Sequence, residues 1–121
     1  MDEKIIQLIK SLTLKTIMNK AKWNKTSRDT EFKLILSDGS ITVDAWFDEE
    51  RGEACNDFRL YNKNGDGVYS MLNSYGEHSE KFDLVNDLHS AAKGKFYKID
   101  ETIDSILKEV DSVLTVGETE F

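Results

Sequence analysis

The stretch EFKLILSDGSITVDAWF, residues 31–47, decides the fold of this chain. It consists of two runs in which apolar and polar residues alternate, separated by Asp38-Gly39. An Asp-Gly pair in this position predicts a β-hairpin with a two-residue type I′ turn, and the turn fixes the register of the strands. The predicted pairs of the apolar face are Leu36–Ile41, Leu34–Val43 and Phe32–Ala45. Those of the opposite face are Ile35–Thr42, Lys33–Asp44 and Glu31–Trp46.

A second hairpin is predicted around NKNGDG, residues 62–67, which also has the spacing that opens a calcium-binding EF-hand loop. An EF-hand requires an Asp at its first position, a bidentate Glu at its twelfth and flanking helices. Counted from Asn62, the first position is a neutral Asn, the twelfth is Asn73, and the flanking runs alternate as strands do. The sequence therefore favours a hairpin over a calcium site. The pairs expected from an Asn64-Gly65 turn are Leu60–Tyr69 and Phe58–Met71.

The rest of the chain predicts three helices and two polar loops. Residues 2–20 carry apolar residues largely at helical spacing, with Asp2 and Glu3 where the helix dipole favours negative charge. Residues 24–29 and 48–56 are polar and are interpreted as surface loops. A helix over residues 79–93 is expected to stop at Gly94. Its predicted inner stripe is Phe82, Val85, Leu88 and Ala92.

The last helix is predicted to begin at an Asp100 N-cap. Its apolar residues have the spacing of a helix that faces a core. They are Ile103, Ile106, Leu107, Val110, Val113 and Leu114.

Together these elements predict an α+β fold in the order α-β-β-β-β-α-α. A four-stranded antiparallel meander would have its apolar face covered by helices. The length of 121 residues suits a single domain over residues 1–121, and 39% hydrophobic with 32% charged residues suits a soluble globular chain.

Charge is distributed unevenly along the chain. Residues 1–33 hold eight basic and four acidic side chains, a net +4, and residues 34–121 hold eight basic and nineteen acidic side chains, a net −11. An acidic body repels phosphate backbones, so nucleic acid is not an expected partner. It favours a protein partner with a basic surface, or serves solubility alone.

Cellular location is also indicated. A single cysteine, Cys55, excludes an intramolecular disulfide, and MDEKIIQLIK is neither a signal peptide nor a membrane span. We expect a cytoplasmic protein with no membrane association.

Few residues suggest catalysis. His78 and His89 belong to no ligand-spaced cluster, and acidic neighbours Glu53 and Asp57 are expected to raise the pKa of the Cys55 thiol. Glu31-Phe32-Lys33 has the E-x-K spacing of many metal-dependent nucleases. With Asp44 it gives the alternative hypothesis, a metal-dependent phosphodiesterase using Glu31, Lys33 and Asp44. A structural Lys33–Asp44 pair is the interpretation we favour, with no metal or cofactor and no enzymatic activity expected.

The face of the sheet opposite the helices is the expected partner-binding surface. Trp, Tyr and Arg dominate binding hot spots. The candidate residues are Trp46, Arg59, Tyr61, Asp44, Asp48, Glu49 and Glu50. The alternative is that the 48–56 loop or the 22–29 segment covers Trp46 and Tyr61.

From about Trp23 to Val110 the chain resembles a set of small uncharacterised bacterial α+β proteins. The resemblance rests on the Trp, a strand hairpin, the turn Tyr61-x-x-Asn64-x-x-Gly67 and the closing pattern LVNDLHSAAKGKFYKIDETIDSILKEV. That pattern usually carries Ala-Arg-Arg where this chain has Ala91-Ala92-Lys93.

More distantly, the order of helix, Trp, strand meander and helix is similar to that of YezG-like immunity proteins, which neutralise bacterial toxins. Those proteins tend to end in a Trp-bearing strand, whereas this chain is predicted to end in a helix. We therefore expect a small cytosolic acidic protein-binding module, of the immunity or anti-defence inhibitor type, that binds through its sheet face.

Overall fold

The computed structural model describes residues 2–77 and 79–117 and shows an α+β fold. Helix α1 precedes five strands and a short 3₁₀ helix, and two helices follow. The elements in chain order are α1 (Asp2–Ile17), β1 (Asn24–Lys25), β2 (Glu31–Leu36), β3 (Gly39–Asp48), β4 (Glu53–Asn62), β5 (Gly67–Ser74), η1 (Tyr75–Glu77), α2 (Glu80–Phe96) and α3 (Ile99–Ser112).

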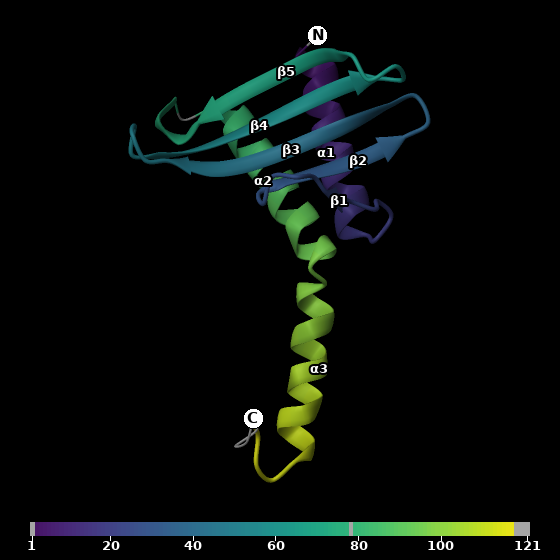
Figure 1. Ribbon diagram of the computed structural model, residues 1–121, viewed down its shortest axis with the longest axis vertical. Helices are drawn as coiled ribbons and strands as arrows, with labels where there is room; N and C mark the ends of the chain where they lie inside the picture. The colour runs from purple at the N-terminus through teal and green to yellow at the C-terminus, as the bar shows by residue number, and fades with distance from the viewer. Residues whose placement is uncertain (1, 78, 118–121) are drawn as a thin grey trace.

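The strands form one antiparallel sheet in the order β1-β2-β3-β4-β5. Helices α1 and α2 lie on the same face of this sheet, and α3 extends away from it (Figure 1). The prediction of four strands is wrong, because Asn24 and Lys25 pair with Lys33 and Phe32 and add a short edge strand within the predicted 24–29 loop. The 48–56 loop is also shorter than predicted, since β3 extends to Asp48 and β4 begins at Glu53.

The first hairpin is confirmed, but its predicted turn and register are wrong. Leu34 pairs with Ile41 and Phe32 with Val43, so the turn is Ser37-Asp38 and Gly39 already belongs to β3. Neither turn residue has a positive φ, which excludes a type I′ turn. The register differs from the prediction by two residues. Because side chains alternate with a period of two, the two faces are still correctly assigned.

Gly39 has a different role from the predicted one. A Cβ at this position would collide with the backbone carbonyl of Tyr61 on β4. The glycine therefore permits a close approach of two strands and does not supply a left-handed turn residue.

The predicted pairs of the second hairpin are confirmed, but its turn is longer than the predicted Asn64-Gly65 pair. Asn62 N–H donates to the Asp66 carbonyl, and the register shifts between Leu60 and Tyr61. Phe58 pairs with Met71 and Leu60 with Tyr69, and Gly65 takes a positive φ of 90° in the turn. The Asn62 side chain accepts hydrogen bonds from the backbone N–H groups of Asn64 and Asp66, which closes the loop without a metal ion.

The core lies between the sheet and the pair α1 and α2. Ile9, Phe32, Val43 and Phe58 are fully or almost fully buried there, and Leu88 joins them from α2. The predicted α2 stripe is confirmed, since its four residues Phe82, Val85, Leu88 and Ala92 are all buried.

Trp23 anchors the chain after α1. Asn19 takes a left-handed φ of 62°, and Lys20 N–H donates to the Lys15 carbonyl, which ends the helix in a Schellman arrangement. Trp23 is then buried, and its Nε1 donates to Thr16 Oγ1 at 3.0 Å. Thr16 in turn donates to the Leu12 carbonyl, so every polar atom in this chain of contacts has a partner inside the core.

The prediction that Gly94 stops α2 is wrong. The helix passes through Gly94 and ends at Phe96, with Tyr97 as its C-cap. A glycine within a helix lowers its stability but does not break it, because no hydrogen bond is lost.

The predicted role of α3 is also wrong. Its N-cap is Lys98 with a left-handed φ of 54°, rather than Asp100, and the helix ends before Val113 and Leu114. No residue of α3 is buried. Its apolar stripe is present as predicted, but the core is already closed by α1 and α2.

Candidate partner-binding face

The sheet face turned away from α1 and α2, here called the open face, carries a row of charged residues. In register, Glu31 on β2 lies opposite Asp44 on β3, and Asp44 lies opposite Asp57 on β4. Asp44 is 0% exposed and Asp57 is 4% exposed, although no helix covers this face. Long neighbouring side chains must therefore shield them from water.

Asp44 is held by the segment between β1 and β2. Arg28 Nη2 lies 2.7 Å from Asp44 Oδ2, and the Thr30 hydroxyl donates to Asp44 Oδ1 at 2.6 Å. The Arg28 guanidinium also lies 5.9 Å from the centroid of the Trp46 ring, within cation–π range. The ion pair to Oδ2 is close, but its N–H is not aligned for a hydrogen bond, so this oxygen retains acceptor capacity.

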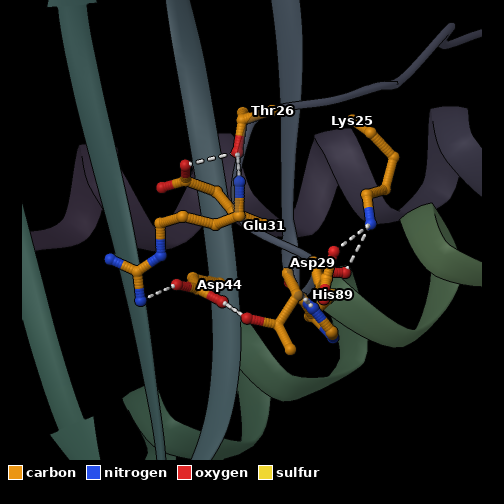
Figure 2. A network of polar contacts seen from close by, with 8 residues as sticks. Lys25, Thr26, Asp29, Glu31, Asp44 and His89 are labelled. Carbon is orange, nitrogen blue, oxygen red and sulfur yellow. Dashed lines mark hydrogen bonds and ion pairs between the residues drawn. The ribbon is translucent and has the colours of Figure 1, made fainter.

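The same segment is tied down at both of its ends (Figure 2). The Thr26 hydroxyl donates to Glu31 Oε1 at 2.8 Å, and Lys25 Nζ donates to the Asp29 carbonyl at 2.7 Å. His89 on α2 lies 2.7 Å from the Thr30 carbonyl through Nε2. Since a carbonyl can only accept, Nε2 carries a proton and donates. His89 thus fixes the loop that presents Arg28.

Asp57 is less well compensated than Asp44. Its Oδ2 lies 3.3 Å from Arg59 Nη2, but its Oδ1 is buried without a hydrogen-bond partner. Burial raises the pKa of the Asp57 carboxyl, and the charges of Asp44 and Glu31 raise it further, while Arg59 and Arg28 lower it. A buried acceptor without a donor costs free energy, which a donor from another molecule would recover.

A hollow of about 220 Å³ lies beside Asp57. Arg28, Trp46 and Arg59 border it, and Leu72, 67% exposed, supplies apolar surface. The remaining lining residues are Asp57, Ser70 and Met71. The site therefore combines an aromatic ring, two half-exposed guanidinium groups and a buried carboxylate.

The structure brings together part of the predicted partner-binding set. Trp46 and Arg59 border the hollow, and Arg59 also borders a second hollow beside the half-buried Tyr61. Arg59 thus lies between the two aromatic residues. Asp44 belongs to the open face but is fully buried under Arg28, so it reaches a partner only through that arginine.

The acidic residues of the β3–β4 turn lie apart from this hollow. Glu49 and Glu50 are exposed, and Asp48 Oδ1 accepts from the backbone N–H groups of Glu50 and Arg51. Asp48 is therefore a turn-capping residue.

Trp46 and Tyr61 are neither fully exposed for a partner nor fully covered by the neighbouring segments. Each side chain is half-buried, and Arg28 from the 22–29 segment lies over Trp46. Arg28 of the 22–29 segment thus partly covers Trp46, and both residues line the hollow.

The residues of the alternative hypothesis have other partners. Lys33 pairs with Thr42 and Asn24, not with Asp44, so the predicted Lys33–Asp44 cross-strand pair is wrong. Glu31 and Asp44 are neighbours, but Asp44 is engaged by Arg28 and Thr30. Within residues 2–77 and 79–117, no group of three or more His, Cys, Asp and Glu side chains is placed to hold a metal ion.

Cys55 lies on β4 and not in a loop as predicted. Burial raises the pKa of its thiol, and Asp48 and Glu53 raise it further, whereas Asp57 is not among the causes. A buried thiol with a raised pKa is a poor nucleophile. The other candidate considered, His78, lies outside the described residues.

Sequence reasoning missed Arg28 and Asp57. Asp57 shares its face with Arg59 because they are two residues apart on one strand, so alternation was a usable signal. Arg28 lies in an irregular segment, and its position over Trp46 follows from tertiary contacts that no local pattern encodes.

Comparisons with known proteins give no further assignment. No family model, no curated protein and no solved structure matches the chain. The resemblance to YezG-like immunity proteins therefore stays a prediction. Among the helices of the described residues, none has the length and apolar character needed to cross a membrane.

Proposed function

We propose that this chain is a small acidic protein-binding module that binds a basic segment of a protein partner on its open face, at the hollow bordered by Trp46 and Arg59. The observation that carries the proposal is the carboxylate of Asp57, which lines this hollow and whose buried Oδ1 has no hydrogen-bond partner. A lysine or arginine side chain of the partner supplies the missing donor. A cytosolic location belongs to the same proposal.

The charges around the hollow support a cationic ligand. The lining itself holds two guanidinium groups, Arg28 and Arg59, and the carboxylate of Asp57. The adjoining carboxylates Asp44 and Glu31 on the same face bring the wider cluster to one net negative charge. The wider surface adds a long-range attraction, since residues 34–121 carry a net −11. The exposed Glu49 and Glu50 in the β3–β4 turn contribute to the rate of association more than to the contact itself.

The expectation of an immunity or anti-defence inhibitor depends on what the partner is. An acidic module that covers a basic surface is suited to block a toxin or a nucleic-acid-binding enzyme. No geometry supports the phosphodiesterase alternative, because Lys33 is not beside Asp44 and Asp44 is already paired with a cation.

Calorimetric titration with a short arginine-rich peptide tests the proposal. Asp57→Asn should weaken binding at least ~10-fold, because a charge-assisted hydrogen bond contributes about 1.5–3 kcal/mol. Asp66→Asn is the matched control: it removes the same charge from the exposed β4–β5 turn and should change affinity less than ~2-fold. Equal losses in both variants would show that only net charge matters and would refute the site.

A further inference from the structure

Helix α3 carries a continuous apolar stripe that the described part of the fold leaves uncovered. Residues Ile99, Ile103, Ile106, Leu107 and Val110 lie along α3 and are between 43% and 57% exposed. Ile99, Ile103, Ile106 and Val110 follow a 4-3-4 spacing, which places them on one side of the helix. Soluble chains rarely leave such a continuous stripe in water, so it indicates a docking surface.

The connection between α2 and α3 is short, and only the first turns of α3 lie beside the chain's own α1 end and α2. Only Tyr97 and Lys98 separate the two helices, and Tyr97 N–H donates to the Lys93 carbonyl. The Tyr97 ring packs edge-on against Phe96, with ring centroids 5.0 Å apart, and against Phe32 of the core, with ring centroids 6.2 Å apart. These contacts set the direction in which α3 leaves the domain, and most of the helix extends away from the sheet with its stripe uncovered (Figure 1).

The end of α1 offers a surface of matching character. Leu14, Ile17 and Met18 are 51–59% exposed there, although they are large apolar residues. Beside them lies a hollow of about 460 Å³, which Ile17 lines together with Ala91 and Gly94 of α2. The start of the same chain's α3 forms its other wall, with Ile99, Asp100, Glu101 and Asp104. A Cβ added at Gly94 would meet nothing within 4 Å, so space for an approaching helix exists along this side of α2.

The two surfaces also have opposite charges. Residues 99–112 hold five acidic side chains and one lysine, a net −4. Residues 4–22 hold five lysines and no acidic residue, a net +5. Two α3 helices would repel each other, whereas α3 and the end of α1 attract.

From these observations we propose that two copies of this chain exchange their α3 helices. The apolar stripe of each α3 docks on Leu14, Ile17 and Met18 of the other copy, and its acidic flanks face the lysines of α1. Because the exchange is reciprocal, the contact between α3 and the end of α1 forms twice in each dimer. This interface uses neither the open face nor Asp57, so it stands independently of the proposed function.

Analytical ultracentrifugation of the full chain tests the exchange first. The parent should sediment as a dimer, and Ile106→Lys should sediment as a monomer at the same concentration. Ser105→Lys, which adds the same charge to α3 outside the stripe, should weaken dimerisation less than Ile106→Lys. A parent that stays monomeric throughout the concentration range would overturn the proposal.

Cysteine cross-linking then identifies the contact. Leu14→Cys and Val110→Cys proteins, oxidised as a mixture, should give a covalent heterodimer far in excess of either homodimer. The parent, whose Cys55 is buried, should give none. A cross-link of Val110→Cys with itself would show α3 pairing with α3. In a third protein that carries both Leu14→Cys and Val110→Cys, an intramolecular cross-link would show α3 folded on its own α1. Either result would overturn the exchange.

Discussion

At the scale of single residues, Asp57 is the group whose environment is least compatible with its charge. Burial raises its pKa first, and the neighbouring carboxylates Asp44 and Glu31 add to that shift. A raised pKa in the folded state means that the folded protein binds the proton more tightly than the unfolded chain. Ionised Asp57 therefore opposes folding at neutral pH, and this cost is relieved as the pH falls through the folded-state pKa.

Asp57→Asn should increase the free energy of unfolding at pH 7, because the amide carries no charge to bury. The gain should shrink towards the ordinary aspartate pKa of about 3.9, where the parent is protonated as well. Denaturant unfolding of both proteins at pH 7 and at about pH 4 measures this difference. If the variant were the less stable protein at pH 7, the Arg59 ion pair would outweigh burial and this account of Asp57 would be wrong.

At the scale of elements, the two faces of the first hairpin differ in what they contribute. Leu34 is buried on the helix-covered face, whereas Lys33 is only half-buried on the open face. Leu34→Ala should lower the free energy of unfolding by about 2–5 kcal/mol as a core truncation. Lys33→Ala should lower it by less than ~1 kcal/mol. Chemical denaturation compares them, and similar losses would contradict the assignment of faces.

Two glycines should respond to alanine in opposite directions. Gly39→Ala should be destabilising, because the new methyl group collides with the Tyr61 backbone carbonyl and strands β3 and β4 must separate. Gly94→Ala should be stabilising by about 0.5–1 kcal/mol, because it lies within α2 with open space around its Cα. Thermal melts of the two variants beside the parent measure both effects, and a tolerated Gly39→Ala would argue against the close strand approach.

Elements whose signals are local could be predicted from the sequence, and those that depend on tertiary contacts could not. Asn64-Gly65 determined its hairpin because the positive φ of Gly65 is a local requirement. The Asp38-Gly39 pair led to a wrong predicted register, because a glycine is required at position 39 by the close approach of the Tyr61 backbone on β4 and not by the turn. The spacing of the apolar residues in α3 predicts a buried helix face. It does not distinguish burial in the core of the same chain from burial against another molecule. Arg28, which completes the candidate site, had no local signal for the same reason.

At the scale of the whole molecule, the domain has a closed core, and its open face, the stripe of α3 and the apolar end of α1 are uncovered. If α3 is exchanged between copies, mass action links stability to concentration. The melting temperature of the parent should then rise with protein concentration, whereas that of Ile106→Lys should stay constant. Scanning calorimetry over a wide concentration range measures this, and a constant melting temperature in the parent would argue against exchange.

Partner binding at the open face can be measured directly, because the two tryptophans lie in different parts of the molecule. Trp46 borders the hollow, whereas Trp23 is buried in the core and its Nε1 is bonded to Thr16. The indole N–H signals of ¹⁵N-labelled protein can be followed by NMR during titration with the arginine-rich peptide. We expect a saturable shift of the Trp46 signal that requires at least ~10-fold more peptide in Asp57→Asn, with the Trp23 signal unchanged. Saturable peptide binding that leaves the Trp46 signal in place would contradict binding at the open face.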